Sequence, residues 1–231
     1  MMLKRSLLAV SVAALVMVGC KKKDVAADAA PPASEAATQT APAASTDANA
    51  APAAPTPTAT AATFDINSYP VSDKPLGEWP YVQLPAGYRF DTDKLGEDTK
   101  DLARVPVWTG DALVWVEGKT FETKLYTNDG KTYSKFELGK GIAQSVEALG
   151  GKRVSNKIFD ESFANAHEEE LKSFLKEFDK IDDAYRYYSE GTDTYLIRRA
   201  DKAIWVVTFL DESNNASMMV AEGPLPVAEA K

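Results

Sequence analysis

The chain has 231 residues, of which 45% are hydrophobic and 26% charged, and its formal net charge is -8 at neutral pH. This acidic balance argues against nucleic acid and against an anionic lipid surface as principal partners, because both carry negative charge. Cys20 is the only cysteine, so an exported form of the chain would carry one unpaired thiol that needs a use.

Residues 1–19 have the organisation of a secretory signal. Two basic residues, Lys4 and Arg5, precede an apolar run that ends at Gly19-Cys20. The run is shorter than the roughly 20 apolar residues that a membrane-spanning helix needs. Gly19 followed by Cys20 resembles the lipobox of bacterial lipoproteins. The resemblance implies cleavage between these two residues, a diacylglycerol on the Cys20 thiol and an acyl chain on the new amino terminus, with no other cofactor.

The residues around Cys20 also bear on the membrane to which a lipoprotein would be sorted. Met17 departs from the lipobox pattern, which usually has leucine there, and Lys21 stands where aspartate would retain the protein in the inner membrane. We therefore expect membrane lipid as a partner through Cys20, sorting to the outer membrane, and a domain that faces the periplasm in preference to the exterior. Several acyl chains would make the anchoring stable. The alternative is a secreted chain with an incidental cysteine.

Residues 20–63 are predicted to form a tether. After residue 23 the composition is almost entirely alanine, proline, threonine and serine with scattered polar residues. Such a segment buries too little apolar surface to offset its conformational entropy, and repeated prolines interrupt every long helical window. The sequence predicts a disordered linker, with ends roughly 35 Å apart as a coil and about 120 Å apart when extended. A spacer role is favoured over a recognition motif.

Residues 64–231 are predicted to form one domain, and they hold all four tryptophans and all nine tyrosines. β-branched and aromatic runs predict strands over 105–108, 112–116 and 120–126. The continuous apolar run over 112–116 predicts a central strand covered on both faces. In the next strand the acidic Glu122 alternates with apolar neighbours, which predicts a half-exposed strand.

Two helices and a second group of strands follow. Apolar residues at helical spacing predict helices over 134–149 and 162–178, with a short strand near 152–155 between them. Three further strands are expected as an antiparallel meander, at 194–199, 203–209 and 216–221. The sequence therefore predicts an α+β fold, with about two helices packed on one face of an antiparallel sheet, preceded by the lipoprotein signal and the disordered linker.

Short stretches across the domain carry a family resemblance. They are residues 84–88, 108–111, 115–119, 136–138, 149–151, 195–201 and 204–205. Together they resemble the N-terminal region of proteobacterial lipoproteins of the OmpA-family type, over most of the domain and through motifs that are structural rather than catalytic. In that family a C-terminal peptidoglycan-binding domain often follows. No segment here resembles its motif, so the resemblance does not imply peptidoglycan binding.

Residues that would indicate metal binding are few. His167 is the only histidine and lies in an acidic helix, whereas zinc sites draw on several histidines or cysteines, so a solvated helix face is expected. Residues 91–96 begin like a calcium loop, but Leu95 and Leu102 stand where ligands should be. A surface loop and no bound metal are predicted.

Catalytic signals are equally sparse. Carboxylates such as Glu117 and Asp193 would serve acid–base chemistry on glycans only if they shared a cleft, and spacing along the chain does not indicate one. No Gly-x-Ser-x-Gly elbow is present. The sequence therefore favours a protein that is not an enzyme.

The densest polar and aromatic cluster is Arg198, Arg199 and Asp201 beside Trp205. It is the candidate interaction surface, with structural ion pairing of the arginines as the favoured alternative. The function expected is that of a non-catalytic envelope lipoprotein with a binding or structural role at the outer membrane, whose partner would be an envelope protein. The alternatives are a lipoprotein hydrolase and a small-ligand carrier, acting on a periplasmic glycan, peptide or lipid.

Overall fold

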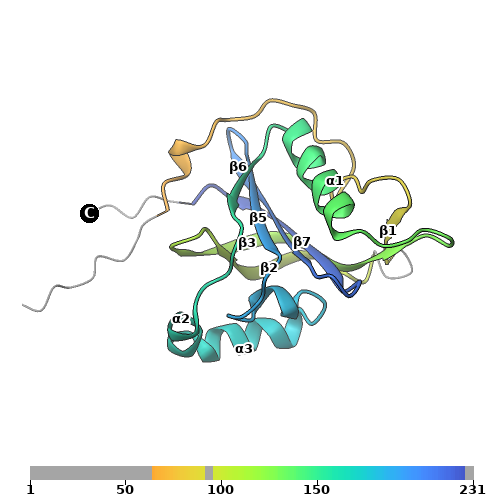
Figure 1. Cartoon of the computed structure of the whole chain (residues 1–231). Coiled ribbons are helices and arrows are strands. Elements are labelled where there is room, and N and C mark those ends of the chain that lie inside the picture. The colour runs from red at the N-terminus through yellow and green to blue at the C-terminus, as the bar shows by residue number, and fades with distance from the viewer. Residues whose placement is uncertain (1–63, 92–95, 227–231) are drawn as a thin grey trace, which may run out of the picture. The chain divides into compact units, whose positions relative to one another are not determined.

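The computed structural model describes residues 64–91 and 96–226, which belong to one compact unit. The predicted signal, Cys20 and the predicted tether lie outside the described residues. The described chain folds into a seven-stranded antiparallel sheet with helices on both sides (Figure 1). Its strands are β1 (Tyr88–Phe90), β2 (Thr99–Trp108), β3 (Leu113–Thr127), β4 (Lys152–Ser155), β5 (Thr192–Arg198), β6 (Lys202–Leu210) and β7 (Ala216–Pro224).

The sheet order is β1-β3-β7-β6-β5-β4, and β2 pairs with β3. The long strand β3 changes partners along its length: residues 113–121 pair with β2, residues 119–124 with β7, and residues 125–127 with β1. β5, β6 and β7 form the predicted meander, with Trp205 opposite Leu196 on one side and Ala221 on the other.

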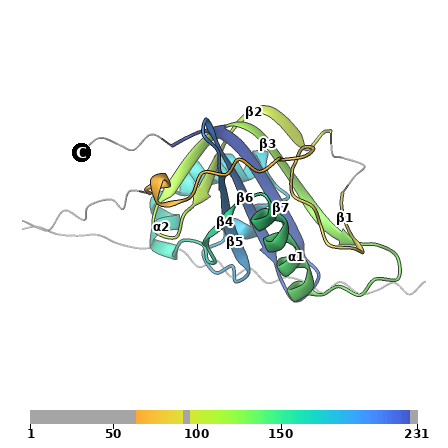
Figure 2. The same ribbon diagram turned by 90° about the horizontal axis from the view of Figure 1, so that it is seen from above.

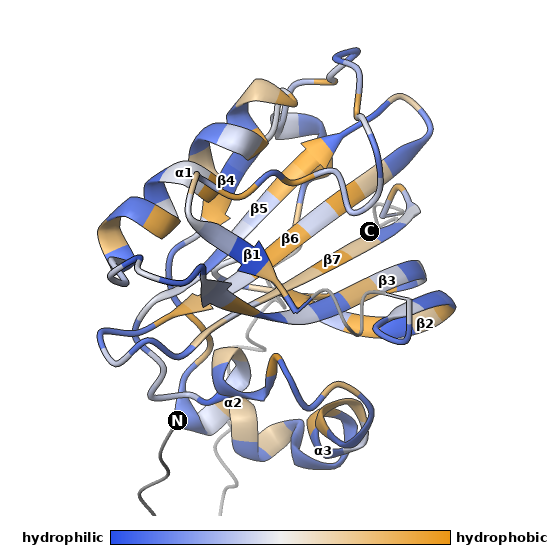
Figure 3. Cartoon of the chain, turned by 90° about the vertical axis from the view of Figure 1, so that its right-hand side faces the viewer, coloured by the Kyte–Doolittle hydropathy of each residue, from blue (hydrophilic) through white to orange (hydrophobic). Residues whose placement is uncertain are grey.

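Helices cover both faces of this sheet. They are α1 (Lys135–Ala148), α2 (Glu161–Ala166) and α3 (Glu168–Glu177), with short 3-10 turns η1 (Ile66–Ser68) and η3 (Asp182–Tyr185). On β6, Ile204 and Val206 belong to the same core cluster as the buried side chains of α1. The alternate residues Trp205 and Val207 belong to the cluster that includes α3. Figure 2 shows α1 in front of β6 and β7, and Figure 3 shows α1 on one side of the sheet with α2 and α3 on the opposite side.

The α+β class and the antiparallel sheet are confirmed, but the helices do not share one face. The physical reason lies in β6, whose residues 203–210 are all buried, so that the sheet has two apolar faces and needs a cover on each. The run over 112–116 does not form the central strand, because this part of β3 pairs with β2 alone. There Trp115 packs beneath the Arg104 guanidinium, 4.2 Å from ring centroid to Cζ.

The predicted helices are present with one interruption. α1 matches the first prediction, and the Ser134 hydroxyl accepts a hydrogen bond from the backbone N–H of Glu137 at its N-terminus (3.2 Å). The second predicted helix is divided into α2 and α3 at His167, whose backbone leaves the helical region. The imidazole of His167 stacks on Phe163, with 4.2 Å between ring centroids.

Candidate functional site

Two arginines of the cluster predicted from the sequence, Arg198 and Arg199, bind the first residues of the domain. The Arg198 guanidinium donates hydrogen bonds to the carbonyls of Ile66 (3.2 Å) and Tyr69 (2.9 Å) and to the Asn67 amide oxygen (2.8 Å). Arg199 donates to the carbonyl of Lys74 (2.6 Å). Among the described residues, neither arginine forms an ion pair with a carboxylate, so their structural role is carried by backbone carbonyls.

The structure does not bring the four predicted residues together on one surface. Trp205 is 1% exposed, and its ring packs against Phe64 with 5.4 Å between centroids. Asp201 lies exposed in the turn between β5 and β6. The cluster therefore divides into a core tryptophan, one solvent-facing carboxylate, and a pair of arginines that bind residues 64–87, which precede β1 and which we call the lead-in segment.

The weaker sequence candidates lie apart from one another. Glu117 pairs with Arg104 (3.4 Å) on the β2–β3 hairpin, whereas Asp193 pairs with Arg153 (3.4 Å) on β5 and β4. The His167 imidazole is 3.7 Å from a Glu170 carboxylate oxygen. Within residues 64–91 and 96–226, no group of three or more potential ligand side chains is placed to hold a metal ion. The interior of the 91–96 loop lies outside the described residues.

Residues 178–190, which connect α3 to β5, form a feature that the sequence did not indicate; we call them the η3 segment. Four of their side chains, those of Phe178, Ile181, Ala184 and Tyr185, are buried in the core. The Tyr185 hydroxyl donates a hydrogen bond to the carbonyl of Pro106 on β2 (2.5 Å), and burial raises its pKa above the ordinary range. The segment therefore packs on the same face of the sheet as α3.

A buried carboxylate fixes the start of the η3 segment. Glu122 on β3 is 5% exposed, and one of its oxygens accepts hydrogen bonds from the backbone N–H groups of Lys180 (3.1 Å) and Ile181 (3.2 Å). Burial raises the pKa of Glu122 to about 7, against the lowering effect of the Lys180 hydrogen bond and charge. Lys180 in turn forms an ion pair with Asp98, whose side chain is 6% exposed. The prediction that Glu122 faces solvent is wrong, because the η3 segment covers it.

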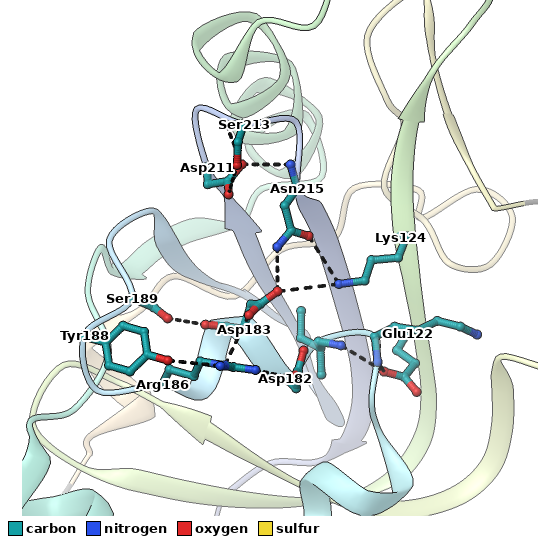
Figure 4. A network of polar contacts seen from close by, with 12 residues as sticks. Glu122, Lys124, Asp182, Asp183, Arg186, Tyr188, Ser189, Asp211, Ser213 and Asn215 are labelled. Carbon is teal, nitrogen blue, oxygen red and sulfur yellow. Dashed lines mark hydrogen bonds and ion pairs between the residues drawn. The ribbon is translucent and has the colours of Figure 1, made fainter. Parts of the chain in front are cut away.

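A second polar network fixes the middle of the η3 segment (Figure 4). Asp183 accepts a hydrogen bond from the Asn215 amide (2.6 Å), and its carboxylate lies 3.9 Å from the Lys124 ammonium. Arg186 pairs with Asp183 (3.2 Å) and donates to the Tyr188 hydroxyl (3.0 Å). These contacts join the segment to β3 and to the turn before β7, so its aromatic side chains stand on a fixed backbone.

Beside this segment lies an open groove of about 620 Å³, formed by α2, α3 and the η3 segment. Its floor is apolar and consists of Ala164, Leu171, Leu175 and Tyr185. Leu171 and Leu175 are one helical turn apart on α3 and therefore present one row of side chains. The sequence showed this spacing, but it could not show that the η3 segment would complete a groove.

Charged and aromatic side chains border the apolar floor. Glu168, Lys172 and Lys176 form a second row along α3, again four residues apart, and Tyr187 comes from the η3 segment. Tyr187 is 46% exposed and packs edge-on against Tyr188, with 5.1 Å between ring centroids. An apolar floor with a few polar groups at its border suits the docking of an apolar group in a fixed orientation.

No protein-family model matches the chain, and no curated protein matches its sequence. The similarity to OmpA-family lipoproteins therefore stays a prediction from short stretches. In the part of the chain that the structure describes, no helix has both the length and the apolar character to cross a membrane.

Proposed function

We propose that the protein is an envelope lipoprotein, anchored through Cys20 in the outer membrane, whose domain is a non-catalytic binding module facing the periplasm. The lipobox-like Gly19-Cys20 and the absence of an aspartate at residue 21 support the address. The groove between α3 and the η3 segment supports a binding role and is the observation that carries the proposal. The proposed partner is a protein of the envelope.

The polar groups that hold the η3 segment in place support binding in preference to catalysis. The Glu122 oxygen that contacts the η3 segment accepts two backbone N–H groups, and Asp98 and Asp183 are engaged by lysines, Asn215 and Arg186. Side chains held in this way stabilise the backbone around them. A rigid aromatic residue at the border of an apolar groove is a common feature of protein interfaces, because it contributes contact area at low entropic cost.

Site-specific crosslinking in intact cells tests this function. A photoreactive phenylalanine analogue at Tyr187 is expected to capture one envelope protein as a discrete adduct. The matched control places the same analogue at Tyr126 on β3, which is similarly exposed at 40% but lies outside the groove lining. The same adduct from both positions, or none from position 187, would contradict the groove as the binding site.

A further inference from the structure

The charges along the groove distinguish it from a purely apolar site. Lys172 and Lys176 lie beside the Leu171 and Leu175 row, in a chain whose net charge is -8. The Lys172 ammonium is 3.8 Å from a Glu169 carboxylate, but both side chains are largely exposed, and such pairs contribute little. Among the described residues, the Lys176 ammonium has no carboxylate within ion-pair distance. Two available cations therefore border the apolar floor.

We infer that the groove receives a protein segment that is both apolar and acidic. This inference rests on the proposed function and names the partner's chemistry. An amphipathic helix fits the geometry, since apolar side chains one turn apart match the row formed by Leu171 and Leu175. Its carboxylates would lie beside Lys172 and Lys176, while its apolar residues contact the floor and Tyr187.

Two further features define the occupant. Glu168 continues the lysine row toward the start of α3 and repels a carboxylate there, so the acidic part of the partner lies toward the end of α3. The chain's own residues 24–62 contain no aromatic and almost no large aliphatic side chain. They cannot supply the apolar contacts, and the proposed occupant is a segment of another protein.

Two peptide probes test this inference on the full-length chain carrying Cys20→Ser, which prevents acylation and leaves every residue of the groove lining unchanged. Both are short, blocked, fluorescently labelled helical peptides with a leucine pair one turn apart. One carries glutamates beside the leucines, and the other carries lysines at the same positions. Fluorescence anisotropy is expected to show at least about tenfold tighter binding of the acidic peptide at low ionic strength, with the difference narrowing as salt screens the charges.

Charge-reversal variants test whether Lys172 and Lys176 cause the preference for the acidic peptide. Lys172→Glu combined with Lys176→Glu should reverse the preference, so that the lysine peptide binds more tightly. The matched control, Lys152→Glu with Lys157→Glu, makes the same change in net charge at exposed positions outside the groove lining and should keep the acidic preference. Circular dichroism of each variant verifies that the fold is retained.

Several results would overturn the inference. These are equal affinity for the two peptides, no binding of the acidic peptide, and an unchanged preference in the Lys172/Lys176 variant. Displacement of the acidic peptide by a short-chain anionic phospholipid below its micelle concentration would assign the groove to lipid instead. If Tyr187 still crosslinks one envelope protein while the acidic preference is missing, the proposed function stands and the acidic partner alone is wrong.

Discussion

Glu122 shows how one buried side chain couples the protein's stability to pH. Its carboxyl group loses hydration beneath the η3 segment, and this loss of hydration is the main reason that its pKa rises from 4.5 to about 7. Asp179 also raises the pKa, whereas the charge of Lys180 and the backbone N–H groups of Lys180 and Ile181 lower it. The folded protein therefore holds a proton on Glu122 over a pH range in which the unfolded chain has released it.

The sign of the pH effect follows from this difference. Between about pH 4.5 and pH 7 the folded state binds more protons at Glu122 than the unfolded state does, so this residue's contribution to stability falls as the pH rises and is lost above about 7.

Glu122→Gln keeps an acceptor oxygen for the two backbone N–H groups and removes the titration. We expect the variant to be more stable than the wild type at pH 8, by about 1–3 kcal/mol, and nearly equal to it at pH 4.5.

Urea unfolding followed by tryptophan fluorescence at the two pH values measures this difference. Glu117→Gln on the same strand is the control, because the Glu117 side chain is 67% exposed and its substitution should leave the pH dependence unchanged. A stability difference between Glu122→Gln and the wild type that stays constant with pH would contradict the assignment.

At the scale of elements, α1 carries two glycines that have different roles. On helix propensity alone, Gly139 and Gly141 each lower the stability of α1 by about 1 kcal/mol relative to alanine. The structure separates them. A Cβ atom at Gly141 would lie 2.6–2.8 Å from the ring of Pro85, whereas at Gly139 the nearest atom is the end of the Leu210 side chain at 3.2 Å. Gly141 thus allows the lead-in segment to pack directly on α1.

The two alanine substitutions should therefore change stability in different directions. Gly141→Ala is expected to lower the free energy of unfolding by about 1–3 kcal/mol, because the Pro85 ring must move. Gly139→Ala is expected to cause no loss, and at most a gain of about 1 kcal/mol from helix propensity. Thermal and urea unfolding of the matched pair compares them. A gain of similar size for both variants would show that helix propensity outweighs packing against Pro85.

The elements themselves were largely predictable, while their arrangement was not. Apolar periodicity placed α1 and the meander of β5, β6 and β7 close to their observed bounds, because it reports which side of an element is buried. It does not report which face of the sheet a helix covers. The buried run over 203–210 in β6 was the signal for two covered faces, but the shorter run over 112–116 was interpreted as the central strand.

At the scale of the whole molecule, the proposed binding function depends on segments that meet only in the folded chain. The groove needs α3 and the η3 segment, and the anchoring of that segment needs Glu122, which looked like a solvent-facing residue of an alternating strand. Arg198 was singled out as part of an interaction surface, but its partners are backbone carbonyls near the start of the domain. Carbonyl groups of a lead-in segment leave no pattern in the sequence.

The proposed lipid anchor at Cys20 gives a prediction that concerns the entire chain. Cys20→Ala removes the thiol that would be acylated, and we expect the protein to move from the membrane fraction to the soluble fraction of the envelope. Lys21→Ala is the control, because it changes the neighbouring residue and leaves the thiol in place. Immunoblots of fractionated cells provide the measurement. Full retention of the Cys20→Ala protein in the membrane would contradict lipid anchoring through this residue.

The hydrogen bonds of Arg198 would have a mechanical consequence if the domain is anchored through Cys20, as proposed. With the proposed lipid anchor in place, a pull from the membrane side would enter the fold at Phe64, whose ring packs against Trp205, and would then reach Ile66 and Tyr69, whose carbonyls Arg198 binds. Val71 lies beside Arg198 in a parallel bridge, so force along the lead-in loads several contacts together rather than opening them one after another. In the proposed anchored protein, the first residues of the domain would therefore resist being pulled away from the sheet.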